Sequence, residues 1–271
     1  MKFFKASNDS MFKSIFTNDK NRDLLECIIE GITKHKIKIT KLLPTEQVKN
    51  NINIKGKTLD LLAKCNNDEF NVEVNTSIYP GLHNRNASYI FKRYSDGLSV
   101  GDDYNKMPKY IQINLTNPNG EDLPLISEYT LYDKKHNIDY IDNLTIYEIN
   151  IEKAKKEWYN TRDGRKLIAL LDCDREELNS IKGDELVEKL KSEVNRLNQD
   201  KDFVEFLSKE DEERLLTNTL VNNAREEGLE QGIEQEKITT AKNMLKKGST
   251  IEFISEITGL SLKKIEELSK Q

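Results

Sequence analysis

The stretch from Leu59 to Asn75 constrains the fold of this 271-residue chain more than any other part. Two runs in which apolar and polar side chains largely alternate, Leu59–Ala63 and Phe70–Asn75, stand on either side of Asn66-Asn67-Asp68. Alternation with a period of two is typical of a half-buried strand, and Asn and Asp favour turns. The segment therefore predicts a strand–turn–strand hairpin.

The hairpin has two alternative registers. A two-residue turn at Asn66-Asn67 places Asp60 opposite Glu73. A turn one position later, at Asn67-Asp68, places Asp60 opposite Asn75 instead. Because side chains alternate along a strand, Asp60, Glu73 and Asn75 share one face in both registers. The opposite face is apolar, and we expect it to pack against helices.

Two carboxylates on one strand face have two interpretations. Like charges that face each other in a sheet are unfavourable, and a divalent cation would compensate them. Mg²⁺ or Mn²⁺ prefers oxygen ligands and can orient a water while stabilising charge on a phosphate. Asn75, on the same face as Glu73, would reach that water or phosphate. The alternative is a solvated strand face that binds no metal.

The segments around the hairpin predict an α/β fold with a mixed sheet flanked by helices. Apolar stripes at helical spacing precede and follow the hairpin, and further period-two runs indicate more strands. The expected helices are 8–16, 20–31 (with Gly31 at its end) and 82–98, and the expected strands lie in 36–39, 52–54, 110–115, 127–133 and 144–151.

The rest of the chain reads as helical. The boundaries of the pattern divide the sequence into a core of residues 1–151, a helical region 152–217 and a charged tail 218–271. In the tail, a charged helical run contains Gly228 and Gly232, which indicates either close approach of a partner helix or a flexible connector. An amphipathic helix 238–247 and two short helices, 251–258 and 262–269, follow with a helix–turn–helix outline.

The tail has three interpretations. Self-association or partner binding is one, contact with DNA is another, and a passive cap is the third. A DNA-reading helix usually presents a clean basic surface. Here Lys263 and Lys264 are offset by Glu266 and Glu267, so we favour oligomerisation through the C-terminal helices.

Composition sets the remaining limits. The net charge of −5 gives no overall basic field that would announce nucleic acid, although a local basic groove is compatible with it. The cysteines Cys27, Cys65 and Cys173 lack metal-ligand spacing and are expected to be reduced thiols. No apolar run is long enough for a membrane span, and the N-terminus lacks a signal-peptide core. We therefore expect a cytoplasmic protein.

Several motifs together resemble the PD-(D/E)XK nuclease superfamily, and more closely its Rpn-type branch of recombination-promoting nucleases and transposases. The resemblance spans most of the chain and implies a restriction-endonuclease-like core with a helical C-terminal extension. The motifs are Asn8-Asp9-x-x-Phe12-Lys13-x-x-Phe16, Leu59-Asp60, Val72-Glu73-Val74-Asn75, Arg85-x-x-x-Tyr89-x-x-x-x-Tyr94, the Glu-Glu-Gly-type run at 226–232, and Ile257-Thr258-Gly259-Leu260-Ser261.

The resemblance also implies an activity and a site. Asp60, Glu73 and the backbone carbonyl of Val74 would bind Mg²⁺ or Mn²⁺ in a DNA endonuclease linked to recombination, mobile elements or phage defence. The third motif position is typically Lys, and often Gln in this branch, but here it is Asn75. An amide orients groups and donates hydrogen bonds without supplying charge. The alternative is therefore a degenerate nuclease fold that binds DNA or protein as a regulator.

Three residues of the helix after the hairpin are candidates for nucleic-acid binding. Arg85 and Tyr89 are four apart and so share a helix face. Arg85 is either a phosphate clamp or a partner in a surface ion pair. Lys92 is grouped with them.

Three further residues have a structural and a functional interpretation. Asp9 is either a helix cap or an auxiliary group in the cleft of the site. Gln112 either faces that cleft or belongs to a plain half-buried strand. His83, near the start of the helix after the hairpin, is interpreted as structural or solvated.

Overall fold

The computed structural model describes residues 2–43, 60–97, 101 and 103–269. By its internal contacts the chain divides into two compact units, Met1–Val204 and Glu205–Gln271. The expected strand at 52–54 and the residue Leu59 lie outside the described residues. In the described part, no helix has the length and apolar character needed to cross a membrane.

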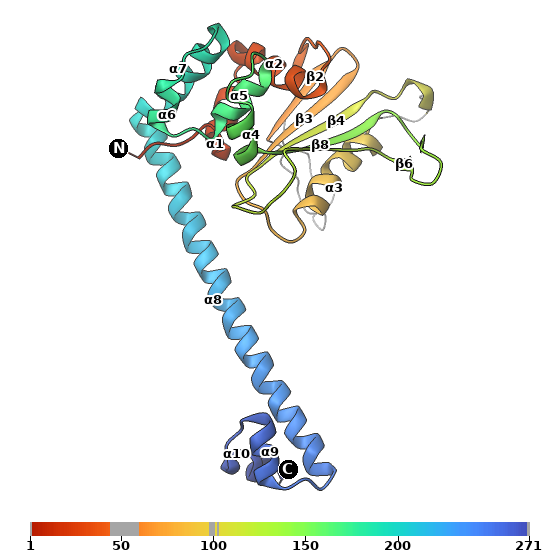
Figure 1. The fold of residues 1–271 in the computed structure, drawn as a ribbon, viewed down its shortest axis with the longest axis vertical. Coiled ribbons are helices and arrows are strands. Elements are labelled where there is room, and N and C mark those ends of the chain that lie inside the picture. Colours follow the sequence, from red (N-terminus) through yellow and green to blue (C-terminus); the bar gives the residue numbers. More distant parts are fainter. Residues whose placement is uncertain (1, 44–59, 98–100, 102, 270–271) are drawn as a thin grey trace. The chain divides into compact units, whose positions relative to one another are not determined.

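A six-stranded mixed sheet forms the centre of the first unit (Figure 1). Its order is β1-β2-β3-β4-β8-β5, in which β4 pairs with β3 and β8 in parallel and the other pairs are antiparallel. The strands are β1 (Lys41–Leu43), β2 (Leu61–Cys65), β3 (Asp68–Asn75), β4 (Tyr110–Thr116), β5 (Ile126–Tyr129) and β8 (Leu144–Asn150). A separate ribbon pairs β6 (Tyr132–Asp133) with β7 (Ile138–Asp139). The predicted mixed sheet is confirmed, although the first strand begins later than residues 36–39.

The hairpin of β2 and β3 adopts the first of the two expected registers. Leu61 pairs with Val72 and Cys65 with Asp68, which leaves a two-residue turn at Asn66-Asn67. Asn66 has a φ of 56°, in the left-handed region that such turns require and that Asn tolerates. The same register continued by one residue sets Asp60 opposite Glu73.

One face of the sheet packs against the N-terminal helices. Asn8 caps α1 (Asp9–Phe16) by accepting from the Met11 N–H, as expected for a helix start. The apolar side of α1 and α2 (Arg22–Thr33) is fully buried with that face. The largest buried side chains of this core are Met11, Phe12, Ile15, Phe16, Leu24, Leu25, Ile28, Ile29, Leu61 and Ile113.

The sequence predicted that α2 ends at Gly31, but the helix extends beyond this residue. It continues to Thr33, and Lys34 forms the left-handed cap with a φ of 62°. Gly31 serves a different purpose, because a Cβ there would lie 2.7 Å from the backbone nitrogen of Arg165. The glycine allows α2 to approach the start of α5 (Gly164–Leu171) closely.

The helices after the sheet belong to the same unit. They are α4 (Ile151–Glu157), α5, α6 (Arg175–Ser180) and α7 (Glu185–Gln199), separated by short loops rather than helical throughout. Asn198 of α7 fastens the N-terminus, since its side chain accepts from the Phe4 N–H and donates to the Phe4 carbonyl.

Helix α3 (Leu82–Ser95) covers the opposite face of the sheet. Ile90 packs with Tyr110 and Leu144, and Tyr89 packs with Leu62. This is the face that carries Asp60 and Glu73, because residues two apart along each strand point the same way. The polar residues of the hairpin therefore lie beneath or beside α3.

The second unit consists mostly of one long helix and a small helical cluster. Helix α8 (Lys201–Lys246) contains the run with Gly228 and Gly232, and α9 (Ile251–Thr258) and α10 (Leu262–Ser269) follow as predicted. A core of Ala241, Ile254, Leu260, Ile265 and Leu268 holds this cluster together.

Candidate metal-dependent active site

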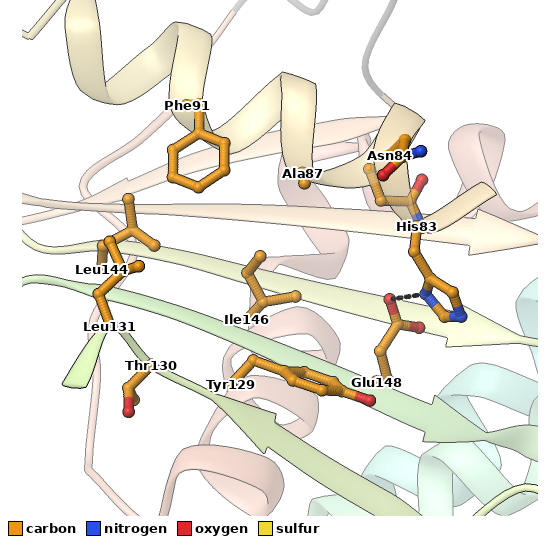
Figure 2. A pocket seen from close by; sticks show the side chains of 11 residues that line it. His83, Asn84, Ala87, Phe91, Tyr129, Thr130, Leu131, Leu144, Ile146 and Glu148 are labelled. Atoms are coloured by element: carbon orange, nitrogen blue, oxygen red, sulfur yellow. Dashed lines mark ion pairs between the residues drawn. The ribbon is translucent and has the colours of Figure 1, made fainter. Parts of the chain in front are cut away.

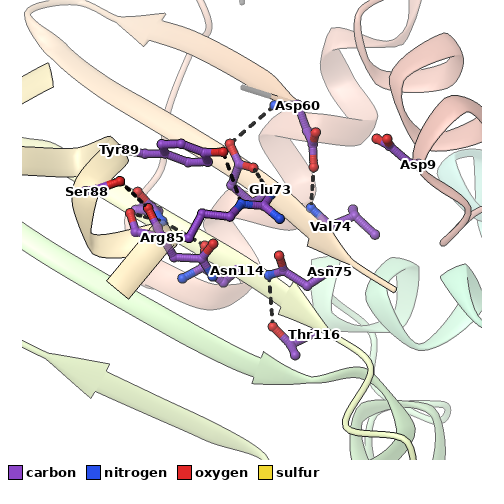
Figure 3. A network of polar contacts seen from close by, with 12 residues as sticks. Asp9, Asp60, Glu73, Val74, Asn75, Arg85, Ser88, Tyr89, Asn114 and Thr116 are labelled. Carbon is purple, nitrogen blue, oxygen red and sulfur yellow. Dashed lines mark hydrogen bonds and ion pairs between the residues drawn. The ribbon is translucent and has the colours of Figure 1, made fainter. Parts of the chain in front are cut away.

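The end of the hairpin brings two carboxylates together (Figure 3). Asp60 precedes β2, and its Oδ2 accepts a 2.8 Å hydrogen bond from the Val74 N–H. Its own N–H donates to Glu73 Oε1 at 3.3 Å. Backbone groups of β3 and of Asp60 thus fix both side chains against each other, independently of any ion.

Burial makes this pair electrostatically unfavourable without a cation. Glu73 is 0 % exposed and Asp60 is 6 % exposed. Burial, followed by the charge of Asp60, raises the pKa of Glu73 from its ordinary 4.5 to about 8. Burial, followed by the charge of Asp9, also raises the pKa of Asp60. A bound cation would offset the cost of holding both groups ionised.

Lys13 is a site residue that the sequence motifs contained but did not single out. Its Nζ lies 3.1 Å from Asp60 Oδ1 and 3.0 Å from Asp9 Oδ1. Burial acts to lower the pKa of Lys13, but Asp60 and Asp9 outweigh it and the pKa is raised. The spacing of four between Asp9 and Lys13 on one helix was the available signal. Asp9 therefore reaches the site through Lys13.

Arg85 lies over the pair from α3. Its Nη2 is 3.6 Å from Glu73 Oε2, and it donates hydrogen bonds to the hydroxyls of Tyr89 and Tyr79, each at 3.0 Å. Its guanidinium also stacks 5.4 Å from the Tyr89 ring centroid. Arg85 and Tyr89 thus meet at the site, whereas Lys92 pairs with Asp96 at 2.6 Å near the other end of α3.

The third motif residue contributes an oxygen to this corner. Asn75 is 4 % exposed, and its Nδ2 donates to Thr116 Oγ1 at 3.1 Å. Its Oδ1 is buried and has no hydrogen-bond partner, and the same holds for Glu73 Oε2. Buried acceptors without partners are costly unless something completes them.

These oxygens fit a hard divalent cation. Because the N–H and C=O of one strand residue point the same way, the Val74 carbonyl faces the side from which Asp60 approaches. Asp60, Glu73 and this carbonyl supply the ligand types that Mg²⁺ and Mn²⁺ prefer. Within the described residues no group of three His, Cys, Asp or Glu side chains could hold a metal, so two carboxylates are the acidic part of this set.

Parallel pairing extends the site across the sheet as two polar rows. Glu73 is in register with Asn114 of β4 and Glu148 of β8. In the next row Asn75 is in register with Thr116, and Thr116 Oγ1 donates to Glu148 Oε2 at 3.3 Å. The sequence analysis did not predict Asn114, Thr116 or Glu148 as partners, because local residue spacing does not indicate the register between distant strands.

Gln112 lies inside this polar layer rather than at the carboxylate pair. It is fully buried, and its Nε2 donates to Asn114 Oδ1 at 2.9 Å and to the Asn86 carbonyl at 3.0 Å. Asn114 in turn donates to Glu148 at 2.6 Å. His83 also reaches this network, with Nδ1 3.5 Å from Glu148 Oε1.

Comparison with protein families finds one relevant similarity. The family model described as "PD-(D/E)XK nuclease family transposase" matches residues 6–219 of this chain. The match covers the first unit except its first five residues, includes every residue of the carboxylate site, and confirms the resemblance found in the motifs. No curated protein and no solved structure matched in the same comparisons.

The raised pKa of Glu73 predicts how stability depends on pH in the presence of a chelator. The folded pKa of about 8 lies above the ordinary 4.5, so the folded state holds an extra proton between these values. The protonated Glu73 contributes its full stabilisation below pH 4.5. The free energy of unfolding then falls by up to about 1.4 kcal/mol per pH unit, and the contribution is lost as the pH rises through 8. Urea unfolding from pH 5 to 9 measures this slope.

Glu73→Gln provides the comparison, because it keeps the shape and removes the titration. We expect its slope to be flatter than that of the wild type, while the exposed control Glu121→Gln keeps the wild-type slope. Equal slopes for the wild type and Glu73→Gln would show that folding does not raise the pKa of Glu73.

Proposed function

Because the chain belongs to the PD-(D/E)XK nuclease family of transposases, we propose that it hydrolyses phosphodiester bonds in DNA as a Mg²⁺- or Mn²⁺-dependent endonuclease. The observation that carries this proposal is the buried pair of Asp60 and Glu73, which backbone hydrogen bonds hold and in which Glu73 Oε2 has no hydrogen-bond partner. A recombination, mobile-element or phage-defence setting is the biological context we propose with it, together with a cytoplasmic location.

The chain's own residues have distinct roles in this proposal. Asp60, Glu73 and the Val74 carbonyl hold the ion. The ion, when bound, supplies a water of lowered pKa and neutralises charge that develops on the phosphate. Lys13 would balance the charge of Asp60 before an ion binds, since the Lys13 ammonium lies 3.1 Å from the Asp60 carboxylate.

Arg85 and Asn75 would act on the substrate. The guanidinium side chain is 38 % exposed, so it can turn part of its donor set toward a phosphate while Tyr79 and Tyr89 hold its orientation. Asn75 Oδ1 would accept a hydrogen bond from the attacking water. Lys92, seven residues after Arg85 on α3, would contact the DNA backbone if it exchanged Asp96 for a phosphate.

Two residues would support these roles indirectly. Asp9 holds Lys13 at 3.0 Å and so helps to place its ammonium near Asp60. Gln112 orients Asn114, which fixes Glu148 in the row that contains Glu73.

A catalytically degenerate binding protein is the second candidate. One observation favours it: one of the two N–H donors of Asn75 Nδ2 is already committed to Thr116, so the third motif position offers no charge and at most one further donor. In this version the fold binds DNA or a protein partner and regulates it without cutting.

We also propose that the chain self-associates through its tail. Leu215, Leu229 and Ile233 are exposed by 68, 64 and 45 %. Leu229 and Ile233 follow Leu215 by 14 and 18 residues, which are close to whole numbers of helical turns. The three side chains therefore lie on one side of α8. Gly232 lies about 90° around the helix from that side, and its lack of a side chain would allow a second helix to approach closely at that flank.

The nuclease activity is tested with purified protein and supercoiled plasmid. We expect nicking or linearisation with Mg²⁺ or Mn²⁺ and none with a chelator. Asp60→Ala and Glu73→Ala should each lower the rate by on the order of 100-fold or more, because losing a residue that merely orients a ligand already costs 10–100-fold. Glu121→Ala, at an exposed position, is the control. Wild-type cleavage no greater than that of Asp60→Ala in either metal would reject the enzyme.

Substitutions of Asn75 distinguish an attenuated enzyme from a decayed one. Asn75→Gln adds reach and Asn75→Lys adds a positive charge, so each is expected to raise the cleavage rate, by roughly tenfold if one additional charge-assisted hydrogen bond is formed. If the wild type is inactive and Asn75→Lys cuts, the binding function is favoured. If both variants are slower than an active wild type, then Asn75 itself is suited to the reaction.

Self-association is tested by sedimentation velocity on the full chain. Leu229→Glu places a charge in the exposed apolar side of α8 and is expected to shift the protein to a slower, monomeric species. Ala224→Glu lies nine residues from Leu215, two and a half turns away on the opposite side, and should leave the sedimentation unchanged. A monomeric wild type at 50–100 μM, roughly the range of weak assemblies, would reject the proposal.

A further inference from the structure

A hollow of about 370 Å³ lies between α3 and the strands β5 and β8 (Figure 2). We call it the base slot and define it by Asn86, Phe91, Tyr129, Leu144, Ile146 and Glu148. None of the roles proposed above uses its interior. Its volume is at the lower end of the range for sites that bind small molecules.

The walls of the base slot suit a flat apolar group. Phe91 projects from α3 and Tyr129 from the end of β5, on opposite sides of Ile146. The two aromatic residues are 46 and 51 % exposed, so their rings are accessible to a ligand in the hollow. Leu144 closes the apolar end. A planar ring placed between these walls would bury apolar surface on both of its faces.

The polar edge of the base slot offers a specific hydrogen-bonding group. Asn86 is 1 % exposed, and neither its Nδ2 nor its Oδ1 has a hydrogen-bond partner. A buried amide without partners costs free energy, and a ligand that supplies one donor next to one acceptor would remove that cost. Glu148 adds acceptor oxygens to the lining, where its contact with His83 lies.

The sheet register places this slot beside the carboxylate pair. Glu148 and Glu73 occupy the same row, two strands apart, which corresponds to about 10 Å. A chain of hydrogen bonds from Asn75 through Thr116 to Glu148 joins the two places. A polymer whose phosphate lies at Asp60 and Glu73 could therefore present its neighbouring unit to the base slot.

We propose that the base slot binds one unstacked nucleobase of the strand that the carboxylate site engages, so the proposal rests on the proposed function. Phe91 and Tyr129 stack on the base, as aromatic side chains do in single-strand binding sites. Asn86 pairs with a base edge that has one donor beside one acceptor. Adenine presents this pattern at N6 and N7, and an unstacked thymine presents it at N3 and O4, so the pairing accepts more than one base and adenine serves as the probe.

The test measures binding in a chelator, so that cleavage plays no part. Fluorescence anisotropy gives the affinity of the full-length protein for three 12-nucleotide strands: one of adenines, one of thymines and one of abasic sites with the same phosphates. A 12-nucleotide RNA strand of adenines is also measured. It carries the same base as the DNA strand, so the difference in affinity shows which sugar the protein prefers. The variants are Phe91→Ala, Tyr129→Ala and Asn86→Leu.

The wild type should bind the adenine strand on the order of tenfold tighter than the abasic strand, and each variant should lose most of this difference. Binding to the abasic strand should not change. Tyr140→Ala is the matched control, since this tyrosine is 86 % exposed and does not line the slot. Asn86→Leu should unfold at an equal or higher urea concentration, because it removes unpaired polar atoms, and this excludes misfolding as the cause.

Two outcomes would overturn the proposal. One is equal affinity of the wild type for adenine and abasic strands. The other is a base preference that survives in all three variants. Neither depends on cleavage: base-dependent binding without any nicking would reject the endonuclease and keep the slot, whereas nicking without a base effect would reject the slot alone.

Discussion

The hydrogen bond from the Val74 N–H to Asp60 is the contact on which the site depends. It closes the open end of the β2–β3 hairpin and turns the carboxylate of Asp60 toward Glu73. The reciprocal bond from the Asp60 N–H to Glu73 then fixes the second carboxylate. With these bonds, two acidic groups stay together in a buried place where electrostatics alone would separate them.

Two cationic side chains compensate part of the negative charge of this pair, each next to one carboxylate. Lys13 comes from the N-terminal helix and touches Asp60, while Arg85 comes from α3 and lies 3.6 Å from Glu73. The distance from Arg85 to Glu73 Oε2 is too long for a hydrogen bond, and this buried oxygen has no hydrogen-bond partner. An ion is the natural complement of this arrangement. The neutral Asn75 adds oxygen but no charge, so the proposed cleavage depends on what this amide can contribute.

Parallel strands connect the carboxylate pair to the rest of the α3 face. Their register aligns Glu73 with Glu148 and Asn75 with Thr116, so hydrogen bonds run continuously from the hairpin to the hollow at β8. Helix α3 contributes to both places, since Arg85 reaches one and Phe91 lines the other. A single helix lying across three strands can therefore position a phosphate clamp and a base-stacking ring.

The hairpin follows from the sequence alone, because strand alternation holds Asp60, Glu73 and Asn75 on one face whichever turn is used. The sequence left the register open, and it placed the end of α2 at Gly31, where the structure instead shows a close approach to α5. Local spacing identifies which side chains share an element, but it carries no information about contacts between elements. Only the tertiary structure, through pairing and packing of distant segments, brought Lys13 to Asp60 and Glu148 into the row of Glu73.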